Sequence, residues 1–257
     1  MQAAPAAHAG ENPYGLLPAL QQGGIIAWSV FFILVGMSIM SFYILFTKWM
    51  QQQKIINQGK KVRASFWNSP NLREAGQKLE AKSAYRAIVD DAIIAQDQHG
   101  KLTDPIDQHD WMTNSLARSQ GAINSRLGEG LAFLATVGST APFIGLFGTV
   151  VGIYRALIKI GSAGQASIDA VAGPVGEALI MTALGLVVAV PAVLAYNWLI
   201  RRNKAIVEDL AAFTNDLHGY LMSNGAVKPV MASPGPSKTV TPGRTSTAQP
   251  AQPRQPA

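Results

Sequence analysis

The sequence predicts an all-α membrane protein with three transmembrane helices, two of them extended into the cytoplasm, and a helical cytoplasmic loop domain. Three runs, 25–46, 131–153 and 178–200, each hold 22 or 23 residues without a charged side chain. About 20 helical residues cross the hydrocarbon core of a bilayer, and a helix satisfies its own backbone hydrogen bonds there. Charged residues make up 14% of the chain, against roughly 25% in a soluble domain.

Lysine and arginine are distributed unevenly around the three runs. None precedes Lys48, and only Arg155 and Lys159 lie between the second and third runs. Because basic residues favour the cytoplasmic side of a membrane, we expect the N-terminus outside and the C-terminus in the cytoplasm. Ten basic residues support this orientation: Lys48, Lys54, Lys60, Lys61, Arg63, Arg118, Arg126, Arg201, Arg202 and Lys204.

These features divide the chain into eight segments. The first apolar run is too long for a signal-peptide core, and no basic segment precedes it. The tail is rich in Pro, Ser, Thr, Gln and Ala and cannot form a core. The predicted segments are a periplasmic N-terminal segment (1–24), the first span (25–47), a cytoplasmic helical loop domain (48–130), the second span (131–154), a periplasmic loop (155–172), the third span (173–200), a cytoplasmic helix (201–223) and a disordered Pro-rich tail (224–257).

Apolar residues recur at helical spacing in the segments that flank the second and third spans. Met112, Leu116 and Leu127 share one face of a helix that we expect to run straight into the second span. Ile206 and Leu210 continue the third span beyond the membrane in the same way. The pattern predicts two long projecting helices whose apolar stripes need partners, either each other or neighbouring subunits.

Residue types that most enzymes need are missing or scattered. The chain has no cysteine, and its four histidines, His8, His99, His109 and His218, show no metal-ligand spacing. There is no nucleophile–base set and no phosphate-binding loop, so we expect no enzyme, no metal and no cofactor. The net charge of +6 lies beside the apolar runs and in the tail, so membrane orientation explains it better than nucleic-acid binding.

Glu177 is the strongest candidate for a functional side chain, because it is an acid at the start of the third span. An acid near the bilayer centre costs about 2.5–3.5 kcal/mol and by default belongs to a proton or ion pathway. The alternative is a hydrated acid at the outer interface. Helical rise puts Thr149 and Thr182 at one level, and Glu177 about 7.5 Å further out than Thr182. Alternatively, each threonine hydroxyl only bonds to its own helix.

Small residues and prolines in the spans are candidates for helix packing and pore lining. Gly145, Gly148 and Gly152 lie in the second span, where small residues let membrane helices approach closely. Pro142 and Pro191 each fall near mid-membrane, where a missing backbone donor can bend a helix. For each of these residues plain helix packing is the alternative to a functional role.

Two long motifs resemble the ExbB/TolQ/MotA proton-channel family. They are 132–153, AFLATVGSTAPFIGLFGTVVGI, and 176–197, GEALIMTALGLVVAVPAVLAYN. They cover the second and third spans, and the three-span layout with a large first cytoplasmic loop matches as well. The pore acid of the family falls on Glu177, and its pore threonines fall on Thr149 and Thr182. Ser139-Thr140-Ala141 before Pro142 and the Pro-rich tail depart from the usual pattern.

The resemblance implies a bacterial inner-membrane motor subunit with protons as the transported ion. It implies a homo-oligomer, a pentamer, whose second and third helices line a pore. A dimer of a single-span partner, ExbD or TolR, would sit in that pore, and a TonB-like or TolA-like protein would receive the motion and energise outer-membrane transport. The N-terminal residues Asn12-Pro13-Tyr14-Gly15 and the Pro-rich tail favour the ExbB type over the TolQ type of the Tol-Pal system. A passive membrane assembly scaffold is the second hypothesis.

Overall fold

The computed structural model describes residues 16–69, 71–103, 106–163 and 168–229, and every regular element in these ranges is a helix. Helical stretches in α1, α4–α5 and α6 are long and apolar enough to cross a membrane. The predicted all-α class with three spans is therefore confirmed. The elements are α1 (Leu16–Ser65), the 3₁₀ helix η1 (Phe66–Asn68), α2 (Leu72–Gln77), α3 (Ala84–His99), α4 (Gln108–Gly128), α5 (Leu131–Ala163) and α6 (Ile168–Met222).

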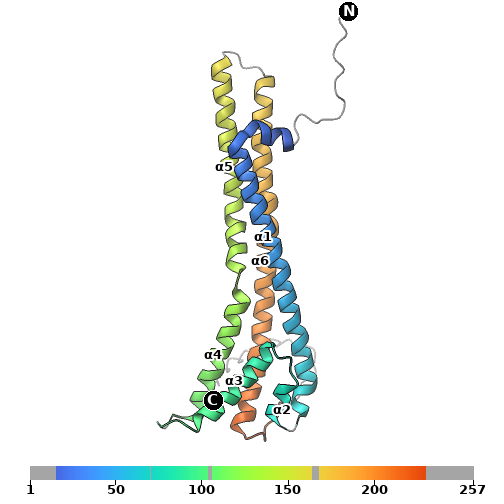
Figure 1. Cartoon of the computed structure of the whole chain (residues 1–257), viewed down its shortest axis with the longest axis vertical. Helices are drawn as coiled ribbons and strands as arrows, with labels where there is room; N and C mark the ends of the chain where they lie inside the picture. Colours follow the sequence, from blue (N-terminus) through green and yellow to red (C-terminus); the bar gives the residue numbers. More distant parts are fainter. Residues whose placement is uncertain (1–15, 70, 104–105, 164–167, 230–257) are drawn as a thin grey trace, which may run out of the picture.

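Helices α1, α5 and α6 lie side by side along the long axis of the molecule (Figure 1). Helix α4 continues from α5 toward the end where α2 and α3 lie (Figure 1). We call the end of the spans marked by Lys48, Arg126 and Arg201 the basic end. The loop domain is residues 48–130 together with residues 201–222 of α6. Residues 12–15 at the N-terminus and residues 230–257 of the tail lie outside the described residues.

The predicted apolar stripes of α4 and α6 pack against each other within one subunit. Both stripes belong to a single core, which α3 completes, so a neighbouring subunit is not needed to cover them. Burial of these side chains is the main stabilising contribution to the loop domain. The most buried members of this core include Met112, Leu116, Leu127, Ile206, Leu210, Leu217, Tyr85 and Ile88.

A polar cluster joins α1, α3 and α6 beside this core. The Tyr85 hydroxyl donates a hydrogen bond to Asp209 Oδ2 at 2.5 Å, and Arg63 forms an ion pair with the same carboxylate. Helix α1 can approach because residue 59 is glycine: a Cβ on Gly59 would lie 2.8 Å from Asp209 Oδ2. Burial raises the pKa of Tyr85, so the neutral hydroxyl remains available as a donor.

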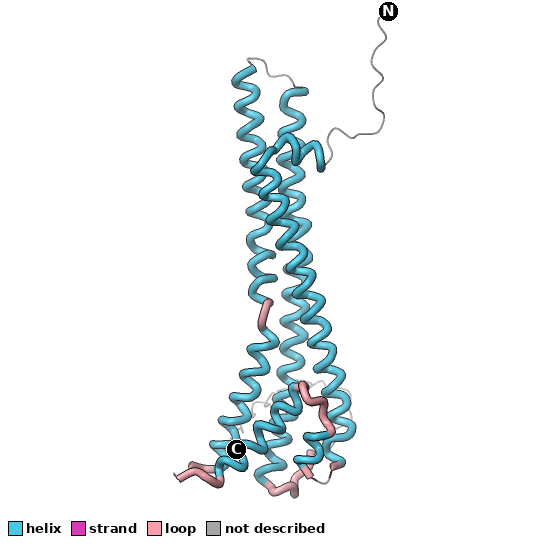
Figure 2. The backbone as a smooth tube through the Cα atoms, viewed as in Figure 1, coloured by secondary structure: helices cyan, strands magenta, loops and turns pink. Residues whose placement is uncertain are grey.

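The expectation that the loop-domain helix runs straight into the second span is wrong. Helix α4 ends at Gly128 and α5 begins at Leu131, and Figure 2 shows the interruption as a loop within the helical column. Gly130 has a φ of 79°, a left-handed conformation that favours glycine. Distant side chains satisfy the carbonyls freed at the break: Lys48 Nζ donates to the Arg126 carbonyl at 2.7 Å, and Asn203 Nδ2 donates to the Leu127 carbonyl at 2.9 Å.

Helix α1 has its own bend near the opposite end of the bundle. Gly24 has a φ of 60° and a ψ of −151°, so the helical path changes direction there. The guanidinium group of Arg155 on α5 donates a hydrogen bond to the Gly23 carbonyl, which supplies a partner for a group that the bend removes from the helical ladder. Arg155 is one of the two basic residues that oppose the charge pattern, and this contact gives it a structural role.

Most of the segment predicted as the outer loop is helical. Residues 155–163 continue α5, and α6 already begins at Ile168. A helix keeps its backbone hydrogen bonds internal, so both spans extend past their apolar cores by further turns. Residues 164–167 between them lie outside the described residues.

Candidate functional site

The second and third spans meet at two glycines that let the backbones of α5 and α6 touch. A Cβ on Gly145 would lie 2.6 Å from the Met181 carbonyl oxygen, and a Cβ on Gly185 would lie 2.7 Å from the Ala141 carbonyl oxygen. Both distances are far below van der Waals contact, so neither position accepts a larger residue without a shift of a helix. The sequence singled out Gly145 as a packing residue but missed its partner, Gly185.

The packing register brings the two candidate threonines to one level. Gly148 precedes Thr149, and a Cβ on Gly148 would lie 2.9 Å from the Cβ of Met181, which precedes Thr182. Thr149 is 7% exposed, and its hydroxyl donates to the Leu146 carbonyl at 2.6 Å. Thr182 is half-buried. The two hydroxyls thus belong to one polar layer between otherwise apolar helices.

Glu177 lies on α6, on the side of Thr182 that is remote from the basic end. Its backbone is part of the helix, and its side chain lies outside the described residues. Five residues of helix separate it from Thr182, a rise of about 7.5 Å. The proton-pathway role predicted for Glu177, Thr149 and Thr182 stays a prediction.

The other predicted packing residues lie in two different places. Gly152 is buried one helical turn beyond Gly148, and Pro142 is half-buried inside α5, which continues through it. Pro191 is half-buried on α6 and lines a groove between α6 and α1. The glycines and Pro142 therefore belong to the α5 side of the bundle, whereas Pro191 faces α1.

Helices α5 and α6 each present a broad apolar face that the rest of the subunit leaves open. Phe143, Phe147 and Val150 on α5 are exposed, as are Leu186 and Val187 on α6. Large exposed apolar faces mark surfaces that contact lipid or other proteins. These faces flank the polar layer, so lipid or further copies of the chain can enclose it.

A buried amide pair joins α1 to α6 at the basic end, and the sequence did not reveal it. Gln52 of α1 is fully buried, and its Nε2 donates to the Leu199 carbonyl at 3.0 Å and to Asn203 Oδ1 at 2.7 Å. Asn203 is 8% exposed and in turn caps the break at Leu127. In the sequence, Gln52 and Asn203 are polar residues among charged ones next to the membrane, and nothing marks them as partners. Their contact becomes evident only when α1, α4 and α6 are placed together.

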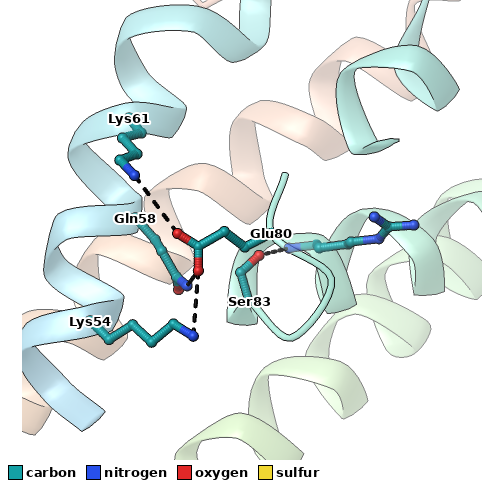
Figure 3. Close-up of polar contacts among 6 residues, drawn as sticks. Lys54, Gln58, Lys61, Glu80 and Ser83 are labelled. Atoms are coloured by element: carbon teal, nitrogen blue, oxygen red, sulfur yellow. Dashed lines mark hydrogen bonds and ion pairs between the residues drawn. The ribbon is translucent and has the colours of Figure 1, made fainter. Parts of the chain in front are cut away.

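Glu80 is the centre of an ion cluster in the loop domain (Figure 3). Lys54, Gln58 and Lys61 project from α1 toward its carboxylate (Figure 3). Gln58 Nε2 donates to Glu80 Oε2 at 2.8 Å, and the two ammonium nitrogens lie 3.4 and 3.8 Å from the carboxylate. The hydrogen bond from Gln58 and the lysines hold the pKa of Glu80 below its usual value. The cluster attaches the turn that precedes Ser83, the N-cap of α3, to α1. It is separate from the polar layer.

The described residues hold no group of three or more His, Asp or Glu side chains placed to bind a metal ion. The two histidines that do meet, His109 and His218, have ring centroids 4.8 Å apart at the far end of the loop domain. Burial, and then the neighbouring His109, lower the pKa of His218. This pair joins the start of α4 to the end of α6.

A family model described as the MotA/TolQ/ExbB proton channel family matches residues 84–212. The matched range covers α3, α4, α5 and most of α6, including the whole polar layer. The chain therefore belongs to the MotA/TolQ/ExbB proton channel family. This is a class of membrane-spanning transport subunits and not a known class of enzymes.

Similar proteins from several bacteria indicate the type within the family. The chain is 38% identical over 213 residues to Biopolymer transport protein ExbB of Xanthomonas campestris pv. campestris, which covers 79% of this chain and 84% of that protein. It is 37% identical over 209 residues to ExbB of Neisseria meningitidis, with 79% and 95% covered. Tol-Pal system protein TolQ of Pseudomonas aeruginosa is 32% identical over 218 residues, with 79% and 90% covered. The ExbB interpretation is supported over the TolQ alternative.

Proposed function

We propose that the chain is the ExbB-type subunit of an inner-membrane proton channel and motor. With an ExbD-like and a TonB-like protein, it would convert proton motive force into energy for TonB-dependent outer-membrane transport. The observation that carries the proposal is the family match over residues 84–212, because this range contains both spans that hold the polar layer. Identity of 36–38% to proteins named ExbB supports the type.

The exposed apolar faces of α5 and α6 support an assembly of several copies, and we propose a pentamer. The α5–α6 pair is rigid because its backbones touch at Gly145 and Gly185. Five such pairs would line a central pore, with α1 toward the lipid. The pore would hold a dimer of a single-span, ExbD-like protein. An acidic side chain in the span of that partner would pass the polar layer of each subunit in turn.

Within this pore, Glu177 would hold or relay protons. The hydroxyl groups of Thr149 and Thr182 would form hydrogen bonds with water and with the partner helix. Thr149 donates its only proton to the Leu146 carbonyl, so its oxygen still offers lone pairs to a donor. Thr182 makes no hydrogen bond among the described residues, so its hydroxyl can both donate and accept. The layer is thus suited to passing a proton through water and not to holding a metal.

The charge distribution supports an orientation with the basic end and the loop domain in the cytoplasm. Lys48, Arg126 and Arg201 all lie at that end, and basic residues are retained on the cytoplasmic side of bacterial membranes. Glu177 would then face the periplasmic half of the bilayer, where protons enter.

Replacing Glu177 tests the proposal directly. We expect Glu177→Ala and Glu177→Gln to abolish energised siderophore uptake in cells that depend on this chain, because neither side chain can carry a proton. The matched control is Glu208→Gln, which removes an exposed acid of α6 whose nearest cation is 4.0 Å away. Uptake at the unaltered level in both Glu177 variants, with equal protein in the membrane, would rule out the proton role.

A passive assembly scaffold is the second candidate, and the internal hydrogen bond of Thr149 favours it, because such bonds are common in helices that only pack. Proton flux into liposomes separates the two. A channel subunit gives flux that appears or changes when the single-span partner is added and is lost in Glu177→Gln. A scaffold binds the partner equally well but gives no flux in either state.

A further inference from the structure

An open groove lies between α1 and α6 in the half of the bundle next to the basic end. Its volume is about 1150 Å³, and its walls come from α1 and α6. Phe42 and Phe46 of α1 and Leu194 of α6 are among the apolar side chains that line it, and Leu194 is 65% exposed. Nothing in the proton pathway uses this groove.

The groove lies on the side of α6 away from α5. Leu194 follows Gly185 by nine residues, which is half a turn of the helical wheel at about 100° per residue. Because Gly185 is in contact with α5, Leu194 points away from it. An occupant of the groove therefore does not compete with the packing of the two spans.

The length of the groove corresponds to one leaflet of a bilayer. Along α6 it extends from Pro191 to Arg201 and Lys204. Ten residues of helix from Pro191 to Arg201 rise about 15 Å, which is half of the roughly 30 Å hydrocarbon core. The apolar walls can thus accommodate an acyl chain from mid-membrane to the interface.

Unpaired donors gather where the groove reaches the basic end. Trp49 and Trp198 are 43% and 39% exposed, and neither indole N–H has a hydrogen-bond acceptor among the described residues. Arg201 has no ion-pair or hydrogen-bond partner within the same ranges, and Lys204 has only Glu208, at 4.0 Å. The neighbouring Arg202 is already held, since its guanidinium lies 4.7 Å from the Trp198 ring centroid and donates to Gln53.

We infer that the groove binds an anionic phospholipid of the leaflet at the basic end. One acyl chain lies against Phe42, Phe46 and Leu194, and the phosphate and headgroup lie between Arg201 and Lys204. The indole groups donate to the ester and phosphate oxygens at the interface, where tryptophan is favoured. The positive charge makes the site selective for an anionic over a zwitterionic lipid.

Native mass spectrometry of the intact assembly measures this selectivity, with phosphatidylglycerol or phosphatidylcholine of identical acyl chains added stepwise. We expect the first lipid bound per subunit to be phosphatidylglycerol, with a preference of about tenfold or more, since each nearby cation strengthens anionic-lipid attraction. The double variant Arg201→Gln/Lys204→Gln loses that preference. The control Arg118→Gln/Arg126→Gln removes the same charge from exposed positions outside the groove and keeps it.

A second measurement identifies the groove itself. Because the chain has no cysteine, Leu194→Cys can carry a single fluorophore. Brominated phosphatidylglycerol should quench this label more strongly than brominated phosphatidylcholine, and Arg201→Gln/Lys204→Gln should remove the difference. Equal binding of both lipids, an equal loss in the control variant, or a label that neither lipid quenches because a second subunit fills the groove would each overturn the inference. Proton flux is not read in either assay, so the outcome is independent of the channel role.

Discussion

At the scale of single residues, the close contact between the second and third spans requires glycines, because a side chain at either position would collide with the other helix. Gly145 and Gly185 each present bare backbone to a carbonyl oxygen of the other helix. Without hydrophobic driving force between lipid-embedded helices, such close packing is a main source of their association. A methyl group at either position therefore acts on the fold and on the geometry of the polar layer together.

Gly145→Ala tests this contact. The added Cβ meets the Met181 carbonyl oxygen at 2.6 Å, and overpacking of this kind costs about 1–3 kcal/mol. We expect a lower melting temperature of the purified protein in detergent. Gly36→Ala is the matched control, because a Cβ on Gly36 meets no atom within 4 Å, and alanine favours a helix by up to about 1 kcal/mol. Equal melting of the two variants would contradict the proposed contact.

At the scale of elements, the break between α4 and α5 is held by its backbone and by two other helices. Gly130 adopts φ 79°, and the side chains of Lys48 from α1 and Asn203 from α6 bind the last carbonyls of α4. The bond from Asn203 is buried and the bond from Lys48 is exposed. A hydrogen bond contributes about 0.5–1.5 kcal/mol, and more is lost when a buried partner is left unpaired. The break is therefore a defined joint of the fold.

Gly130→Ala tests this joint. Left-handed backbone costs a non-glycine residue about 1–2 kcal/mol, and the new Cβ would also lie 3.3 Å from Ile44 Cγ2. We expect the variant to melt at a lower temperature than the unaltered protein. Gly128→Ala, two residues earlier, lies in α4 with open space around its Cβ position and should be neutral or slightly stabilising. A neutral Gly130→Ala would mean that the joint tolerates another conformation.

The break also marks the limit of what the sequence predicts. The spans follow from charge-free runs, and the shared level of Thr149 and Thr182 follows from helical rise alone. Gly128 and Gly130 look alike in the sequence, and the groups that stabilise the break, Lys48 and Asn203, lie far from it along the chain. Gly185 was missed for the same reason, because its partner Gly145 is known only once the register of two helices is fixed.

At the scale of the whole molecule, the loop domain closes at its far end through the contact of His109 with His218. The pKa of His218 is lowered in the folded chain, so the unfolded chain binds more protons below its pKa of about 6.5. Stability from this group is present above that pH and is lost as the pH falls toward the folded-state value.

We therefore expect the melting temperature to fall as the pH is lowered from about 7.5 to about 5.5, the range in which histidine titrates. His218→Gln should reduce this pH dependence, because glutamine does not take up the proton. His99→Gln is the control: the half-buried ring of His99 lies outside the histidine pair and forms a hydrogen bond with the Ile106 carbonyl, at 2.9 Å. An unchanged pH dependence in His218→Gln would exclude the histidine pair as its cause.

The unbroken course of α6 has a mechanical consequence. It runs for 55 residues, so about 60 Å of continuous helix joins Thr182 to its last turn at 1.5 Å per residue. Rotation of α6 about its own axis at the polar layer is transmitted as torsion to Leu217 in the core of the loop domain. Helix α5 has no such path, because the chain leaves the helical conformation between Gly128 and Leu131 before it continues as α4. Of the two helices proposed to line the pore, α6 is therefore the one that joins the loop domain by continuous helix.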